Sequence, residues 1–258
     1  GYTINDTVVG EGAAAGTRTV TAAVGGAGNL IVGATGVIRL ATSAGGNLSI
    51  TNSSVATLVN NGLITAEAAG RTLTVTPTNV TNNAAMQVTA GTLDLSPNTL
   101  TNVGTISSVG STLSFSGAWS SSGTISATNS TVNLGGTFST NAFTLTRSGG
   151  TVNLTGVMIN TGNTFTFGPA TGSWSLQAGE IRGGTVTMGA TDRLIPSTTG
   201  GLLTDVQING EILLDSSSAT VRVAGATRFN AVRLTASNAT LQASTGYVLN
   251  DLVVAEGA

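Results

Sequence analysis

The chain has 258 residues, of which only 8% are charged, and its formal net charge is −2, so nothing in it favours binding to nucleic acid or to an anionic membrane. It has no Cys and no His, and all nine basic residues are Arg. This composition excludes disulfides, thiolate metal sites, a thiol nucleophile and an imidazole base. No apolar run approaches the roughly 20 residues of a membrane span. We therefore expect a non-enzyme without catalytic, cofactor-binding or metal sites and without membrane insertion of this segment.

The first 45 residues are rich in Gly and Ala, and their repeat is difficult to register. Three stretches there still have the alternation of a β-strand: TRTVTA (17–22), NLIVG (29–33) and GVIRL (36–40). The next stretch, residues 46–70, is a longer irregular repeat.

From residue 71 to 192 the sequence can be stacked in rows of about 20 residues. Each row opens with two apolar residues separated by one polar residue, which is the period-2 pattern of a half-buried strand. The opening strands are RTLTVTP (71–77), GTLDLSP (91–97), STLSFSG (111–117), STVNLGG (130–136), GTVNLTG (150–156) and GSWSLQA (172–178). Asn133 and Asn153 occupy equivalent outward positions, which predicts a short asparagine ladder.

Each row continues with one middle apolar position and then a second strand-like stretch. The middle positions are Leu100, Trp119, Phe138, Met158 and Ile181. The closing strands are GTISS (104–108), GTISA (123–127), FTLTR (143–147), TFTFG (164–168) and GTVTM (184–188). Gly, Asn and Ser fill the gaps, where the chain must turn.

After residue 192 the rows lengthen over residues 193–218. Regular rows then resume at ATVRVAG (219–225) and ATLQAST (239–245).

No apolar stripe with helical periodicity is present, so we predict an all-β protein. The rows indicate a single parallel β-solenoid, or β-helix, over residues 1–258, with about 20 residues and three short strands per coil, and about 12 coils. The inward residues should include Leu93, Leu95, Leu113, Phe115, Val132, Leu134, Val152, Leu154, Trp174 and Leu176.

A long repeat encloses the short one. Residues 246–258 (GYVLNDLVVAEGA) repeat residues 1–13 (GYTINDTVVGEGA) with nine of thirteen positions identical. We interpret the chain as one period, about 245 residues, of a longer tandem or head-to-tail array; the alternative is that two coils share a motif by chance. The residues expected at the repeat junction are Tyr2, Asn5, Asp6, Val8, Val9, Tyr247, Asn250, Asp251, Val253 and Val254.

Rows of the TVNLTG type with closing strands of the GTIS type resemble the repetitive β-helical passenger regions of bacterial autotransporters and of filamentous-haemagglutinin-like adhesins. The stretch SWSLQAGEIRGGTVTM (173–188) is especially similar to repeats of giant surface proteins of that type. The resemblance covers about residues 46–258. It implies a parallel β-helix, surface display and a structural or adhesive role, and it transfers no catalytic or binding residue.

Charged residues are sparse, and their densest patch is Asp192, Arg193, Asp205, Glu211 and Asp215. Such carboxylates are either solvated loop charges or, in a glycan lyase or hydrolase, an acid–base pair, for which Asp205 and Asp215 are the candidates. A nearby group, Arg222, Arg228 and Arg233, either balances this charge or lines one face that recognises an acidic glycan. Trp119 and Trp174 fit core positions better than sugar-stacking platforms.

The closing strands predict two columns of hydroxyl side chains on a flat sheet face. Such an array is either an ordinary exposed strand face or an ice-binding surface. Its members are Thr105, Ser107, Thr124, Ser126, Thr144, Thr146, Thr164, Thr166, Thr185 and Thr187.

From these patterns we predict a structural or adhesive unit of an extracellular, cell-surface fibre, of the kind found in bacterial filaments and biofilms, whose partner is another copy of itself. Low charge and abundant Thr, Ser, Asn and Gly favour that location over the cytosol. The alternatives are an ice-binding solenoid and a β-helix that binds or degrades glycans, with surface glycans as possible partners.

Overall fold

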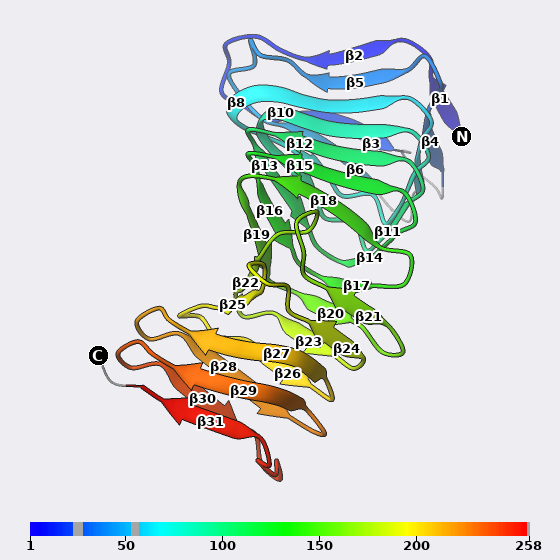
Figure 1. Cartoon of the computed structure of the whole chain (residues 1–258). Coiled ribbons are helices and arrows are strands. Elements are labelled where there is room, and N and C mark those ends of the chain that lie inside the picture. The colour runs from blue at the N-terminus through cyan, green and yellow to red at the C-terminus, as the bar shows by residue number, and fades with distance from the viewer. Residues whose placement is uncertain (23–27, 53–56, 257–258) are drawn as a thin grey trace. The chain divides into compact units, whose positions relative to one another are not determined.

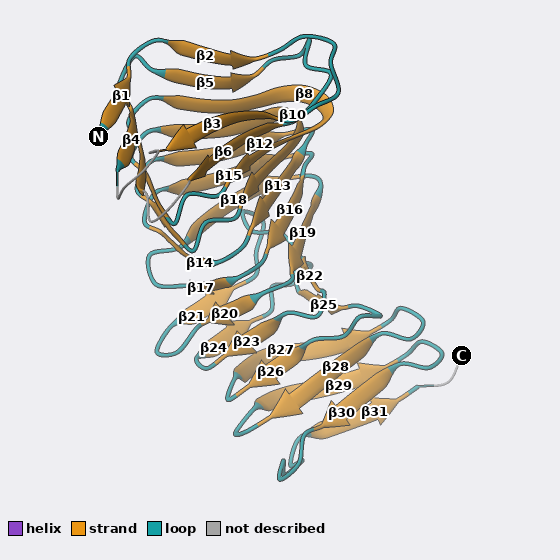
Figure 2. Ribbon diagram, turned by 180° about the vertical axis from the view of Figure 1, so that it is seen from behind, coloured by secondary structure: helices purple, strands orange, loops and turns teal. Residues whose placement is uncertain are grey.

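The computed structural model of the chain describes residues 1–22, 28–52 and 57–256. These residues contain no helix, and therefore none that is long and apolar enough to cross a membrane. They form parallel strands that stack about 20 residues apart in a β-solenoid of about ten turns (Figures 1 and 2). The predicted fold class is thus confirmed.

The coils group into two compact units. Unit 1 comprises residues 1–133 and 142–150, and unit 2 comprises residues 134–141 and 151–258. We describe each unit by itself, and a single domain over residues 1–258 stays a prediction.

Unit 1 has two sets of parallel strands. The first set, which contains the middle positions of the rows, is β1 (Tyr2–Ile4), β4 (Asn29–Val32), β7 (Thr57–Asn60), β9 (Asn79–Asn82), β11 (Thr99–Asn102) and β14 (Ala118–Ser121). The second set contains the opening and closing strands of the rows. It comprises β2 (Thr7–Gly10), β3 (Arg18–Ala22), β5 (Val37–Leu40), β6 (Leu48–Asn52), β8 (Leu63–Val75), β10 (Ala85–Leu95), β12 (Thr105–Val109), β13 (Thr112–Phe115), β15 (Thr124–Thr128), β16 (Thr131–Leu134) and β18 (Thr144–Ser148).

Unit 2 separates these roles into three sets of strands. The middle set is β17 (Thr137–Ser139), β20 (Val157–Ile159), β23 (Glu180–Arg182), β26 (Leu202–Thr204), β28 (Thr220–Ala224) and β30 (Thr240–Ala243). The opening set is β19 (Thr151–Leu154), β22 (Trp174–Leu176) and β25 (Leu194–Pro196). The closing set is β21 (Thr164–Thr166), β24 (Thr185–Thr187), β27 (Gln207–Leu214), β29 (Arg228–Leu234) and β31 (Leu252–Ala255).

The core of each unit is the column of alternate apolar side chains that point inward from successive coils. All ten predicted inward residues are buried, as are the five middle positions. Trp174 is fully buried and Trp119 is 5% exposed, so both tryptophans belong to the core, as predicted. In unit 1 the ring of Trp119 stacks on Phe115 with centroids 4.7 Å apart. Burial of such side chains, at about 1.5–3 kcal/mol each, supports a chain otherwise rich in Gly and Ser.

The number of coils is about ten rather than the 12 expected, because the first coils are longer than 20 residues. Tyr2 pairs with Leu30 and Leu30 with Leu58, so each of these coils takes 28 residues. By contrast, Val80 pairs with Leu100 in a regular coil of 20 residues. The Gly- and Ala-rich start of the chain therefore spends more residues on corners.

Two strands of unit 1 are longer than the rows predict, because a closing strand runs on into the next opening strand. Strand β10 pairs along its first half with β12 and along its second half with β13. The bend between the halves falls at Gly91, which has a φ of +80°. A Cβ there would overlap the carbonyl oxygens of Ala68 and Arg71, so the bend requires glycine.

The same fusion makes one prediction wrong in unit 2. Residues 219–225 and 239–245 do not open rows; they contain β28 and β30, which belong to the middle set. The physical reason is the long strand β27, whose register shifts between Ile208 and Glu211 around Gly210. Its second half takes the place of an opening strand, so the row pattern advances by one strand.

A buried ladder of polar side chains runs through unit 1 at the ends of the middle strands. Asn60 Nδ2 donates to Asn82 Oδ1 at 2.7 Å, and Asn82 Nδ2 donates to Asn102 Oδ1 at 2.7 Å. Asn102 Nδ2 then donates to Ser121 Oγ at 2.9 Å. The three asparagines are at most 1% exposed. The ladder therefore links four successive coils inside the core.

The outward asparagines behave differently from the predicted ladder. Within unit 1, Asn133 donates to Ser114 at 3.0 Å, and within unit 2, Asn153 accepts from Gln177 at 3.1 Å. Both are partly exposed.

Replacing Asn82 with Ala should lower the free energy of unfolding by about 1–3 kcal/mol, because Asn60 and Asn102 each lose a buried hydrogen-bond partner. Guanidinium denaturation followed by Trp119 fluorescence measures this change. The matched control is Asn83→Ala, the adjacent exposed residue, for which we expect a change below about 0.5 kcal/mol. Equal effects of the two substitutions would show that the buried ladder does not stabilise unit 1.

Candidate functional sites

The predicted hydroxyl columns occur in both units. In unit 1, Thr105, Thr124 and Thr144 are paired in register on β12, β15 and β18, and Ser107, Ser126 and Thr146 form the parallel column. In unit 2, Thr164 pairs with Thr185 and Thr166 with Thr187 on β21 and β24. The next strand, β27, continues these columns with Gln207 and Asn209. Within each unit the hydroxyl array thus spans three or two coils, and ice binding stays a prediction.

The acidic patch is not a single constellation. Asp215 binds Arg193 at 2.7 Å, and Glu211 binds Arg233 at 3.0 Å. Asp205 accepts the backbone N–H of Ala226 at 2.7 Å, which fixes a turn. Among the described residues no three His, Cys, Asp or Glu side chains gather as a metal site. The carboxylates that the sequence offered for acid–base chemistry are therefore engaged separately, each with its own partner.

The three neighbouring arginines do not line one face, so that expectation is wrong. Arg222 lies in β28 of the middle set, whereas Arg228 and Arg233 lie in β29 of the closing set. The turn between these strands at residues 225–227 carries the chain from one sheet to the other, which separates the side chains.

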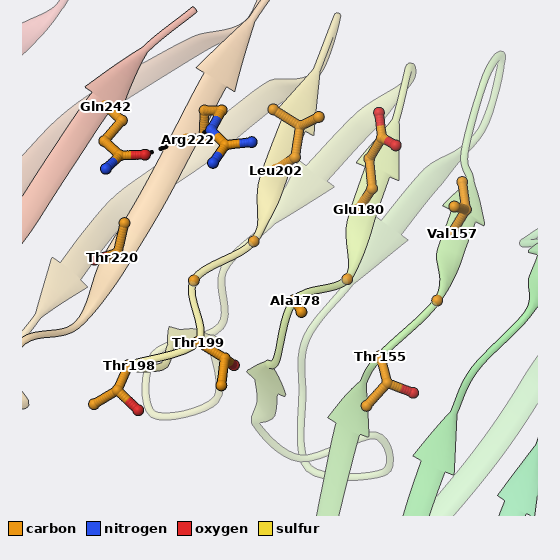
Figure 3. Close-up of a pocket in the computed structure, with 14 residues that line it drawn as sticks. Thr155, Val157, Ala178, Glu180, Thr198, Thr199, Leu202, Thr220, Arg222 and Gln242 are labelled. Atoms are coloured by element: carbon orange, nitrogen blue, oxygen red, sulfur yellow. Dashed lines mark hydrogen bonds between the residues drawn. The ribbon is translucent and has the colours of Figure 1, made fainter.

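A groove that sequence reasoning missed follows a corner of unit 2 (Figure 3). It has a volume of about 550 Å³ and lies where the opening strands turn into the middle strands β20, β23 and β26. Its floor is rich in glycine, for example Gly156 and Gly179, whose hypothetical Cβ atoms would overlap backbone of the preceding coil. Side chains that would fill the corner are therefore absent. The residues that line it with polar groups are Thr155, Glu180, Thr198, Thr199, Thr220, Arg222 and Gln242.

Hydrogen bonds hold the two charged side chains of the groove in place. Glu180 is 14% exposed; it accepts from Arg182 at 2.8 Å and from Thr204 at 2.7 Å. Arg222 Nε donates to Gln242 at 3.5 Å. The hydrogen bond from Arg182 holds the pKa of Glu180 below its usual value, although partial burial opposes this. The groove thus presents hydroxyls, a carboxylate and a guanidinium, which is a set suited to hydrogen-bonding a polar chain.

The predicted junction residues lie in the first and last strands of the chain. Tyr2 is 71% exposed, and Val9 is 41% exposed. In the second copy, Tyr247 is half-buried, and its hydroxyl donates to the carbonyl oxygen of Thr227 at 2.9 Å. The last two positions of the second copy, 257 and 258, lie outside the described residues.

Comparisons with protein-family models, with curated proteins and with solved structures found no match to this chain. The candidate sites are therefore assessed on their own geometry.

The lowered pKa of Glu180 predicts how stability depends on pH. A carboxyl group with a lowered pKa in the folded state stabilises the fold above its ordinary value of 4.5, and this contribution is lost as the pH falls through the folded-state pKa. We expect Glu180→Gln to be less stable than the parent near neutral pH, and the difference to shrink as the pH falls below 4.5. Thermal unfolding over that range measures it. Glu11→Gln, an exposed carboxyl in unit 1, is the control; a similar pH-dependent difference there would contradict the role of Arg182.

Proposed function

We propose that this solenoid is a structural or adhesive unit of an extracellular fibre, in which coil stacking continues from one copy to the next. The observation that carries the proposal is the position of the exposed apolar side chains. Among the described residues seven large hydrophobic side chains are exposed, and five of them lie in the two copies of the terminal repeat: Tyr2, Val9, Val248, Leu249 and Leu252.

Exposed apolar side chains beside unpaired strand edges favour association. A sheet edge that ends without a cover presents free N–H and C=O groups, which pair readily with another strand. Solenoids usually protect such edges with polar capping segments. Here the edges carry an apolar segment that the sequence repeats, so a second copy of this chain is the partner whose chemistry fits.

The extracellular location follows from composition and from the resemblance to β-helical surface proteins. Low charge, no Cys and abundant Thr, Ser, Asn and Gly suit an exposed fibre with a mostly passive surface. We infer no catalytic role, because the carboxylates with potential for acid–base chemistry are held by separate partners.

The proposal is tested by imaging proteins with one, two, three and four tandem copies of residues 1–245, each ending in the complete chain. Continuous stacking predicts thin unbranched particles whose contour length grows by equal increments, since each copy adds the same number of coils. Electron microscopy measures the contour length. Strings of separate particles joined by gaps of variable length would contradict the proposal.

The groove of unit 2 favours a second candidate function, the binding of an acidic polysaccharide. Its hydroxyl side chains can bond sugar hydroxyls, and Arg222 can bind a carboxylate. The buried Trp119 and Trp174 offer no stacking platform, so binding would rest on hydrogen bonds.

For this second function, Arg222→Ala should weaken binding of polyuronate oligosaccharides about tenfold, as expected for loss of one hydrogen bond between charged groups. Isothermal titration calorimetry on the full chain measures the affinity. Arg147→Ala, which removes a partly exposed arginine in unit 1, serves as the control and should have no effect. Absence of measurable binding by the parent chain would exclude polyuronates as ligands of the groove.

A further inference from the structure

The two copies of the terminal repeat use opposite edges of the same strand. In the first copy, β2 pairs with β5, which belongs to the coil that follows it. In the second copy, the equivalent strand β31 pairs with β29, which belongs to the coil that precedes it. The alignment of the copies places Thr7–Gly10 on Leu252–Ala255 without any shift. One copy therefore shows the following neighbour of this strand, and the other copy shows its preceding neighbour.

The backbone groups used in the two copies do not overlap. In the first copy, the carbonyl oxygens of Asp6 and Gly10 accept from Val37 and Ala41 of the following coil. In the second copy, the N–H of Glu256, equivalent to Glu11, donates to Leu234 of the preceding coil at 3.0 Å. Successive residues of a strand turn their polar backbone groups to opposite edges. The same segment can therefore pair on both sides at once.

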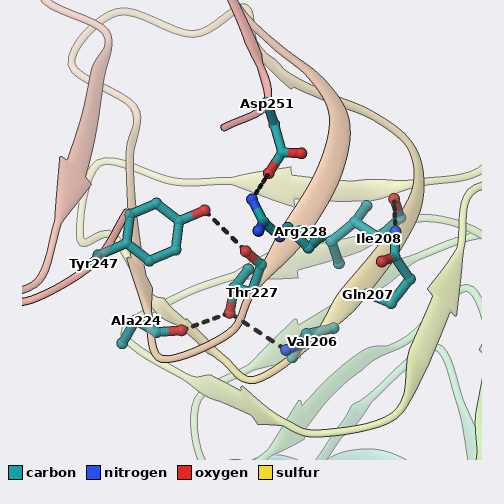
Figure 4. Close-up of polar contacts among 8 residues, drawn as sticks. All are labelled: Val206, Gln207, Ile208, Ala224, Thr227, Arg228, Tyr247 and Asp251. Atoms are coloured by element: carbon teal, nitrogen blue, oxygen red, sulfur yellow. Dashed lines mark hydrogen bonds and ion pairs between the residues drawn. The ribbon is translucent and has the colours of Figure 1, made fainter. Parts of the chain in front are cut away.

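The side chains that attach the second copy to the preceding coil are ones that the first copy shares. Tyr247 donates to the carbonyl oxygen of Thr227 at 2.9 Å, and Asp251 lies 3.8 Å from Arg228 (Figure 4). Glu256 forms an ion pair with Arg233. Burial, followed in importance by the charge of Asp251, raises the pKa of Tyr247.

The same side chains in the first copy have nothing to contact. Tyr2, Asp6 and Glu11 are all exposed. Within residues 1–22, 28–52 and 57–256, their side chains form no hydrogen bond or ion pair. The four positions that differ between the copies supply none of the three polar contacts. The identity of the repeat is thus concentrated in the residues that bind a preceding coil.

We propose that β29 and its flanking arginines form a docking site for residues 1–13 of a second copy of this chain. Strand β2 of that copy takes the register of β31, with Thr7 opposite Ala231 and Gly10 opposite Leu234. Tyr2 then bonds the carbonyl oxygen of Thr227, Asp6 pairs with Arg228, and Glu11 pairs with Arg233. In the single chain, residues 246–256 occupy this site. The inference rests on the proposed end-to-end stacking and specifies its register.

A tandem protein in which residues 1–245 are followed directly by the complete chain 1–258 tests this register. It contains residues 1–13 twice, once at the start and once at the junction. We expect the amides of Thr7, Val9 and Glu11 to exchange hydrogen at least about tenfold more slowly at the junction than at the start, because only the junction supplies a preceding strand. Hydrogen exchange with mass spectrometry separates the two, since the junction peptides also contain residues before 246.

A charge exchange checks the side-chain contacts. Arg228→Glu with Arg233→Glu in the first copy should remove most of the extra protection, and Asp6→Arg with Glu11→Arg in the second copy should restore it. Arg222→Glu, in a strand of another sheet that does not contact the segment, is the control and should leave protection unchanged. Circular dichroism confirms that each variant keeps its strand content.

The possible outcomes separate this inference from the proposed function. Equal exchange rates for the two segments, or protection that is indifferent to the charge changes, would overturn the register. If the junction is protected but longer tandem proteins form no continuous particles, the register stands and the fibre function falls. If continuous particles form without junction protection, the fibre function stands and this docking site is wrong.

Discussion

Every coil of this protein depends on backbone hydrogen bonds to the coil before it and the coil after it. A parallel strand cannot satisfy its own N–H and C=O groups, so each middle, opening or closing strand needs a partner about one coil away in sequence. This requirement fixes the row length near 20 residues, because a shorter or longer row would misplace the partner. It also fixes which side chains point inward, since strands held in register present the same alternate positions at each level. The apolar columns and the glycine-rich corners follow from that pairing.

The buried asparagines show how the same constraint can admit polar groups to the core. An isolated amide among apolar side chains would be costly, but a column of amides lets each one donate to the next. Asn82 bonds Asn60 on one side and Asn102 on the other, so its amide is satisfied only when three coils are in register. A shift of one coil by a single residue would leave these groups without partners. The ladder thus adds specificity to a stack whose apolar contacts alone discriminate weakly between registers.

The sequence predicted the features that depend on the period alone. Leu113 and Phe115, for example, are buried because alternation and row spacing both point them inward, whatever happens at the corners. It failed where a corner changed the count of strands. Gly210 allows β27 to run through two strand positions, and no periodic signal marks that fusion, so residues 219–225 were assigned to the wrong face.

The sites were less predictable than the fold for a related reason. The groove of unit 2 is a space left by corner glycines, and its polar residues, such as Glu180 and Arg222, belong to different coils without a shared motif. The asparagine ladder did leave a signal that was overlooked: Asn82 and Asn102 both end a middle strand, 20 residues apart. Recurrence of a polar residue at a position where its neighbours are buried is evidence for a ladder rather than for a surface.

The terminal repeat is informative because its two copies experience different surroundings. Ile4 is buried beneath the following coil, whereas its counterpart Leu249 is 48% exposed. Tyr2 is exposed, whereas its counterpart Tyr247 is half-buried against the preceding coil. A segment that served only to cap one end would need polar groups on the side that faces water. Here the apolar positions suit the following coil, and the shared tyrosine and acidic residues suit the preceding one. Both faces of the segment are therefore adapted to contact, which is the property required of a strand inside a continuous stack.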